Sequence, residues 1–168
     1  MAKARPVPGL TCHETYGSAA AKILLVRTHE LSEHRRGVLD TKDIEGVHAM
    51  RVATRRLRAA LEVFEPCLPG EGYSEVLADV KRLADALGER RDRDVMIEAL
   101  SSFAAELPAS DRRGLDSLVE TLRTEQGEAN DLLASRVEDA RVSELCERLG
   151  ALAGRASVAA AEEGVGTP

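Results

Sequence analysis

Residues 47–64 read VHAMRVATRRLRAALEVF, and this stretch decides the fold. Its apolar side chains, together with one threonine, recur at intervals of three or four residues: Val47, Met50, Thr54, Leu57, Leu61 and Phe64. That spacing is typical of a helix that buries one face against neighbouring helices. We therefore predict that residues 47–64 form a core helix.

A second line of side chains on the same helix is basic, and we call it the arginine stripe: His48, Arg51, Arg55 and Arg58. Their three- and four-residue spacing places them on one side of the helix, beside the apolar face, whereas Arg56 points away. Because no acidic residue lies between positions 47 and 61, neighbouring arginines repel by a few tenths of a kcal/mol per pair. The stripe predicts an anionic partner. The alternative is that Asp and Glu of adjacent helices neutralise it as ordinary ion pairs.

The composition favours helices over strands. Of the 168 residues only 2% are aromatic and none is Trp, while Ala, Leu, Val, Arg and Glu dominate. The length suits one domain with a substantial core. We predict an all-α fold, an antiparallel bundle of about six helices. It would span residues 17–162, between a flexible N-terminal arm (1–16) and a flexible tail (163–168).

The charge is distributed unevenly along the chain. The formal net charge is −6, so the field of the whole molecule does not attract polyanions. Residues 106–168 contain 13 acidic and 7 basic residues, whereas residues 1–105 contain 16 of each. The arginine stripe is therefore a local feature.

Turn and capping residues divide the first half of the chain. We expect a first helix over residues 18–39, with four side chains facing the core: Ala20, Leu24, Leu31 and Val38. Thr41 or Asp43 is the expected N-cap of the arginine-stripe helix. That helix should end at Glu65, because Pro66 disfavours helical backbone in the residue before it.

The second half is expected to hold four helices. A third helix runs from about Tyr73 to near Gly88, and a fourth covers residues 94–107, with Asp92 or Asp94 capping its N-terminus. Residues 110–139 and 142–162 complete the set. The leucines expected to face inward in residues 110–139 are Leu115, Leu118, Leu122, Leu132 and Leu133.

Cysteine usage and hydropathy exclude several classes. The three cysteines show no C-x-x-C spacing and no nearby histidine cluster, so neither a disulfide framework nor a zinc site is indicated. No stretch approaches the roughly 18 to 20 apolar residues of a membrane span, and no N-terminal apolar run fits a signal peptide. We expect a cytoplasmic protein without a cofactor, a metal or a membrane partner.

Two motifs give the chain a family resemblance. VHAMRVATRRLR (residues 47–58) is followed about 30 residues later by VKRLADALGERRDRDV (residues 80–95). In order and spacing they resemble the CHAD domain, the conserved histidine α-helical domain, over residues 18–152. The resemblance implies a helical module that binds inorganic polyphosphate through basic side chains and has no known catalytic chemistry of its own.

Carried over position by position, the resemblance assigns polyphosphate binding to His48, Arg51, Arg55, Arg56, Arg58, Lys81 and Arg91. Lys22 and Arg27 of the first helix are expected to approach the same groove. His48 either donates to phosphate or hydrogen-bonds a neighbouring helix. Asp92 and Asp94 match the family's acidic pair, and we interpret them as capping and arginine-orienting residues rather than as metal ligands.

Three other functions are considered. An enzyme acting on phosphate chains needs carboxylates for Mg²⁺ beside the arginines, and the stripe contains no acid. A nucleic-acid binder usually shows exposed aromatic side chains or a recognition helix, so with two Tyr and two Phe we do not expect nucleic acid. A granule-associated scaffold would need exposed apolar surface, which the sequence does not settle.

The chain departs from the family pattern in one respect. Full-length members usually have a second basic helix in a C-terminal half, and here the segment after Glu106 is net acidic. We therefore expect that this segment cannot supply a second basic wall. Either two chains associate as a homodimer, or the chain is a half-site, or it is truncated.

Overall fold

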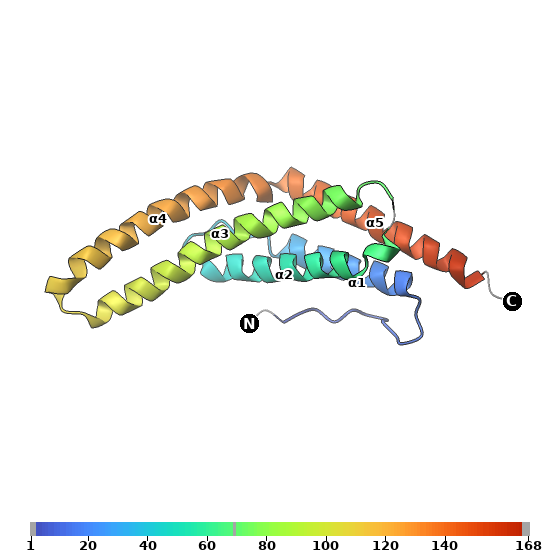
Figure 1. The fold of residues 1–168 in the computed structure, drawn as a ribbon, viewed down its shortest axis with the longest axis horizontal. Helices are drawn as coiled ribbons and strands as arrows, with labels where there is room; N and C mark the ends of the chain where they lie inside the picture. Colours follow the sequence, from blue (N-terminus) through green and yellow to red (C-terminus); the bar gives the residue numbers. More distant parts are fainter. Residues whose placement is uncertain (1–2, 69, 166–168) are drawn as a thin grey trace.

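The computed structural model describes residues 3–68 and 70–165. Over these ranges the chain forms five α-helices, one short 3-10 helix and no strand (Figure 1): α1 (Tyr16–Glu33), α2 (Ile44–Val63), η1 (Glu65–Cys67), α3 (Tyr73–Glu106), α4 (Ala109–Val137) and α5 (Asp139–Val165). The predicted all-α class is confirmed, and the expected number of about six helices is roughly consistent with the structure.

The helices pack in a simple order. α1 packs against α2 and α5, α2 packs against α3, and α3 packs along α4. α1, α2, α3 and α4 alternate in direction, and α5 continues in the direction of α4 and returns along α1 (Figure 1). The far ends of α3 and α4 extend beyond the other helices as a hairpin (Figure 1). The core therefore sits at the end of the molecule that contains α1, α2 and α5.

α2 is the core helix that its sequence predicts. All six side chains of the predicted apolar face are buried: Val47, Met50, Thr54, Leu57, Leu61 and Phe64. Asp43 is the N-cap, because its carboxylate accepts a hydrogen bond from the Glu45 amide at 3.1 Å. The helix ends at Val63, just before the expected Glu65–Pro66 break.

The predicted break between a third and a fourth helix is wrong. α3 runs without interruption through Gly88, Asp92 and Asp94, so neither aspartate is an N-cap. One glycine inside a helix costs only about 1 kcal/mol relative to alanine, and packing along α4 outweighs that cost. α3 and α4 together form one long two-helix unit.

α4 buries a narrower face than its leucines suggest. Leu122 and Leu133 are buried, but Leu118 and Leu132, both predicted to face inward, are exposed. Along the hairpin α4 has α3 as its main neighbour, and one neighbouring helix covers only a narrow apolar seam.

The helix ends differ from the expectations by a few residues. α1 stops at Glu33 and is followed by a turn with Gly37 at φ 80°, although Val38 is still buried as predicted. α4 and α5 are separated by Glu138 alone, at an extended ψ of 137°. α5 continues to Val165, three residues into the expected tail; residues 166–168 lie outside the described part.

The segment before α1 lies along that helix. The Arg5 amide donates to Glu30 at 2.6 Å, and Arg27 reaches the same carboxylate at 2.6 Å. Burial raises the pKa of Glu30, but these hydrogen bonds and the charges of Arg27 and Arg56 outweigh it, so the pKa ends below its usual range. Glu30 thus holds the N-terminal segment to α1 as a buried carboxylate.

α1 and α5 approach each other closely at a glycine. A Cβ atom on Gly17 would lie 2.9 Å from the carbonyl oxygen of Ala156 and 3.0 Å from Cβ of Ala160. Small residues on both helices therefore permit this contact. None of the helices in the described ranges is long and apolar enough to cross a membrane.

Candidate functional site

The arginine stripe borders an open groove between α2 and α3, which we call the stripe groove. Arg51, Arg55 and Arg58 form its α2 wall, and the groove has a volume of about 500 Å³. The α3 wall contributes three carboxylates at helical spacing: Asp85, Glu89 and Asp92. One wall is thus basic and the other acidic, with equal numbers of formal charges.

The two walls do not neutralise each other by direct ion pairing. Among the described residues, no ion pair or hydrogen bond involves the side chain of Arg51 or Arg55, whereas Arg58 binds Glu62 on its own helix at 2.9 Å. Lys81 of α3 approaches the same carboxylate at 3.7 Å. The hydrogen bond from Arg58 lowers the pKa of Glu62. Ordinary ion pairs therefore account for Arg58 and Lys81 but leave Arg51 and Arg55 available to a ligand.

The other predicted site residues are spread over a wider area. His48 is half-buried, one turn before Arg51 on the same side of α2. Arg56 lies on the opposite side of α2, where its charge acts on Glu30. Arg91 of α3 is half-buried, and its Nη1 atom is buried without a hydrogen-bond partner in the described ranges.

Lys22 and Arg27 do not reach the stripe groove. Lys22 donates to the Gly9 carbonyl and to Glu14, both at 2.7 Å, and Arg27 donates to Glu30 and to the Arg5 carbonyl. Both side chains hold the N-terminal segment against α1. The structure thus separates them from the stripe with which the sequence grouped them.

Residues 90–94 of α3 contribute to a buried polar cluster rather than to a helix cap. Arg90 is fully buried and forms an ion pair with Asp94 one turn later, and Asp94 also accepts from Gln126 of α4 at 2.7 Å. Arg90 Nε donates to Asn130 at 3.2 Å, and Asn130 in turn donates to the Leu39 carbonyl at 3.1 Å. Burial lowers the pKa of Arg90, and the nearby positive charge of Arg91 lowers it further. The cluster joins α3 to α4 and to the segment before α2.

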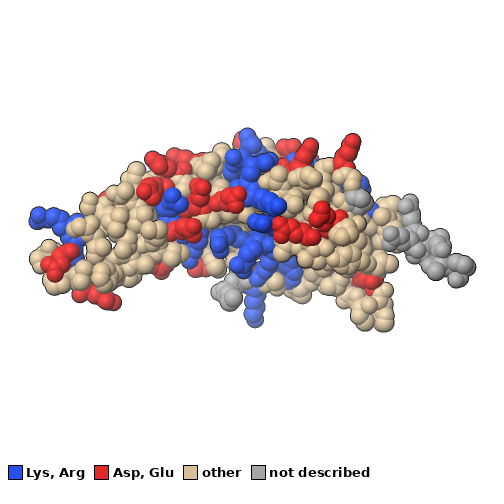
Figure 2. Space-filling model, in the orientation of Figure 1, with Lys and Arg blue, Asp and Glu red and all other residues tan. Residues whose placement is uncertain are grey.

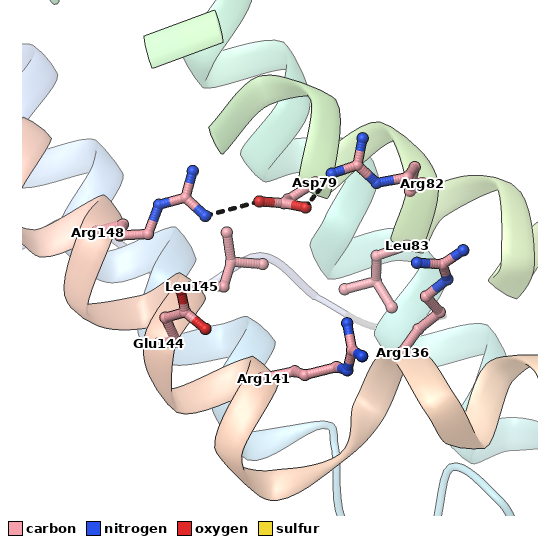
Figure 3. A pocket seen from close by; sticks show the side chains of 8 residues that line it. All are labelled: Asp79, Arg82, Leu83, Arg136, Arg141, Glu144, Leu145 and Arg148. Atoms are coloured by element: carbon pink, nitrogen blue, oxygen red, sulfur yellow. Dashed lines mark hydrogen bonds and ion pairs between the residues drawn. The ribbon is translucent and has the colours of Figure 1, made fainter. Parts of the chain in front are cut away.

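A second arginine cluster was missed by the sequence reasoning. It lines a pocket of about 280 Å³, which we call the α5 pocket (Figure 3), and its members come from α3, α4 and α5: Asp79, Arg82, Leu83, Arg136, Arg141, Glu144, Leu145 and Arg148. Four arginines and two carboxylates line it, and two further carboxylates pair with its arginines: Glu75 with Arg148 at 3.3 Å and Glu138 with Arg141 at 3.7 Å. The segment after Glu106, although net acidic as a whole, thus places three arginines beside α3: Arg136, Arg141 and Arg148.

The surface view shows how these sites relate. Lys and Arg side chains gather in a band across the middle of one face, over α2, α3 and the junction of α4 and α5, with Asp and Glu on either side (Figure 2). No group of three or more His, Cys, Asp or Glu side chains in the described part of the chain could hold a metal ion.

Comparisons with known proteins add the family. The family model described as CHAD domain matches residues 22–166. A solved structure, the crystal structure of the CHAD domain from the plant Ricinus communis, is similar, with a TM-score of 0.72 and 26% sequence identity. The match covers 94% of this chain and 51% of that chain, so the chain spans about half the length of the solved one. No curated protein sequence matches.

Proposed function

Because the chain belongs to the CHAD domain family, we propose that it binds inorganic polyphosphate without cleaving it. The observation that carries the proposal is the pair Arg51 and Arg55: both border an open groove, and neither has an ion-pair partner among the described residues. His48, Arg58 and Lys81 extend the same surface. In this proposal Arg56, Arg91, Lys22 and Arg27 are not primary contacts.

The chemistry of the stripe suits a linear polyanion. Equivalent positions on one side of a helix repeat about every 5 Å, so α2 presents guanidinium groups in a row. Each guanidinium can donate to two phosphate oxygens at once and stays charged beside an apolar core. The acidic α3 wall disfavours a ligand that fills the groove and favours one that lies along α2. A flexible phosphate chain satisfies that restriction.

The test is a titration of the whole chain with polyphosphate, single-stranded RNA and duplex DNA at matched phosphate concentration. About five neutralised phosphates, with the single-strand slope of 0.7 per phosphate, weaken binding about 100-fold between 50 and 200 mM salt. Polyphosphate should bind most tightly. In the variant Arg51→Gln/Arg55→Gln the affinity for polyphosphate should fall. The slope of log affinity against log salt concentration should decrease in magnitude by about 1.4.

The matched control is Arg113→Gln/Arg123→Gln, which removes the same charge from exposed positions of α4. It should keep both the affinity and the salt slope. Salt-insensitive binding, or an equal loss in both double variants, would rule out the stripe as the binding surface. Tighter binding of RNA or DNA than of polyphosphate would favour a nucleic-acid function instead. Phosphate release with added Mg²⁺ is expected to be absent, and its presence would contradict the non-catalytic part of the proposal.

We also propose that two chains can associate. The chain spans 51% of the solved CHAD chain, and a second copy would place basic residues across from the stripe by twofold symmetry. Apposed arginines repel, so a bridging polyphosphate should stabilise the dimer by mass action. Light scattering with and without polyphosphate decides this: a monomer in both conditions, with tight binding at one chain per site, would exclude it.

A further inference from the structure

We infer that the α5 pocket binds a terminal diphosphate group, either as free pyrophosphate or at the end of a phosphate chain. This site is separate from the stripe groove. Its binding of free pyrophosphate stands independently, whereas its role at a chain end rests on the proposed polyphosphate function.

Three helices meet at the α5 pocket because the chain bends at Glu138. The bend places Arg136, in the last turn of α4, and Arg141, in the first turn of α5, on the same side of α3. Figure 3 shows both side chains directed toward the space beside Leu83. Arg82 of α3 lines the pocket as well. Residues distant in sequence thus contribute guanidinium groups to one concavity.

The arginines of this pocket are incompletely paired. Asp79 is shared by two of them: one carboxylate oxygen accepts from Arg82 and the other from Arg148 at 2.7 Å. Arg148 also donates to Glu75 at 3.3 Å, so Arg82 and Arg148 are both paired. Arg141 has only a 3.7 Å ion pair with Glu138, and both of those side chains are mostly exposed, which makes a weak pair. In the described ranges Arg136 has no ion pair or hydrogen bond, although its side chain is half-buried.

This arrangement leaves hydrogen-bond donors and positive charge unused. A guanidinium has five N–H donors; in the described ranges Arg136 has no hydrogen bond or ion pair, and Arg141 has one long ion pair, to Glu138. The positive end of the α5 dipole lies beside Arg141 and adds to the potential there. Arg141 is therefore poorly placed for helix stability alone but well placed to meet an anion.

The dimensions and lining of the pocket select the class of anion. Its volume of about 280 Å³ lies just below the range of roughly 300 to 1,000 Å³ found for pockets of drug-sized ligands, so the ligand is compact. Among the described residues that line it, Leu83 and Leu145 are the only apolar ones, and none is aromatic, so the described lining offers no surface on which a base could stack. Several guanidinium groups in one small space match the closely spaced oxygens of a condensed phosphate.

A chain end fits this pocket better than a chain interior. A terminal phosphate has a second ionisable oxygen, as a phosphate monoester does, and the monoester carries about 1.5 to 2 negative charges at neutral pH; an internal phosphate carries one, so the chain end is the more highly charged group. Arg136, which has no ion pair in the described ranges, and Arg141, which has one long ion pair, are the groups available to this more highly charged terminal phosphate.

The experiment is calorimetric titration of the whole chain with pyrophosphate. One site per chain is expected, and Arg136→Gln/Arg141→Gln should weaken binding at least tenfold. Arg113→Gln/Arg123→Gln, with the same change in charge, should bind like the unmodified chain. Circular dichroism checks the fold, and Arg136→Gln alone is a second variant that breaks no ion pair of the described structure.

Long polyphosphate with open or chemically blocked ends distinguishes the two sources of the ligand. If the pocket holds chain ends, blocking should weaken binding to the unmodified chain but not to Arg136→Gln/Arg141→Gln; equal binding of both polymers assigns the pocket to free pyrophosphate. The inference is overturned if pyrophosphate does not bind, or binds equally well to both double variants. Pyrophosphate binding without long-chain binding would contradict only the proposed function.

Discussion

Replacing Asp94 with alanine is expected to destabilise the fold by about 3 to 5 kcal/mol, the usual cost of removing one partner of a buried ion pair. Asp94 is 2% exposed and Arg90 is 0% exposed. The variant would leave the Arg90 guanidinium in the core with only its Nε bond to Asn130. Arg90 Nη2 already has no hydrogen-bond partner in the described ranges, so little remains to compensate the charge.

This loss is large against the total stability of a domain, about 5 to 15 kcal/mol. For a chain of this length each kcal/mol shifts the melting temperature by roughly 2 to 4 °C, so a decrease of about 6 to 20 °C is expected. Urea unfolding followed by circular dichroism measures the free energy directly. An N-cap at Asp94 would instead cost about 0.5 to 2 kcal/mol.

A paired substitution separates the buried charge from the packing. Arg90→Met/Asp94→Leu removes both charges while keeping apolar volume, and such replacements are often neutral or stabilising by about 1 to 4 kcal/mol. The double variant should therefore be more stable than Asp94→Ala. The reasoning is refuted if Asp94→Ala costs less than about 1 kcal/mol, as an exposed ion pair would, or if the double variant is the less stable of the two.

Two further predictions concern α1. The pKa of Glu30 is lowered in the folded chain despite its burial. Its contribution to the free energy of unfolding is therefore present above about pH 4.3, the unperturbed pKa, and is lost on acidification below that value. In urea unfolding, the free energy of unfolding of Glu30→Gln should decrease less on acidification than that of the unmodified chain, and equal decreases would contradict this. Gly17→Ala should destabilise by about 1 to 3 kcal/mol, because its Cβ would lie 2.9 Å from the Ala156 carbonyl oxygen. Gly127→Ala, with open space around it, should stabilise by about 0.5 to 1 kcal/mol in the same assay, and the opposite order would show that the α1–α5 contact is not tight.

The part of the fold that follows from local rules was predictable. In α2 the apolar spacing, the Asp43 cap and the Pro66 break all indicate the same helix, and the structure contains it. Agreement between periodicity, capping and turn chemistry is the condition under which sequence reasoning is most reliable. The three- and four-residue spacing along α2 also predicted that Arg51 and Arg55 lie on one side of this helix, beside its apolar face.

The error in α3 arose where two local rules compete. Aspartate favours helix N-caps, but it also pairs with an arginine one turn earlier in the same helix. Val80, Leu83, Leu87, Arg90 and Asp94 continue one seam at intervals of three and four residues, and all five are buried. Treating Arg90 and Asp94 as members of that seam would have predicted an unbroken helix with a buried ion pair.

The α5 pocket shows why the net charge of a segment is a poor guide to its surface. The acids of residues 106–168 are spread from the end of α3 along α4 and α5, and many are exposed, whereas Arg136 and Arg141 flank the bend at Glu138. The bend brings them together beside α3 with Arg148, and screening at physiological ionic strength limits the influence of distant charges to about 8 Å. A ligand at the pocket therefore meets its four arginines and the carboxylates that line it or pair with them, Asp79, Glu144, Glu75 and Glu138, rather than the deficit of the whole segment. A second basic site beside α3 thus depends on where the helix bends, which a charge count along the sequence cannot show.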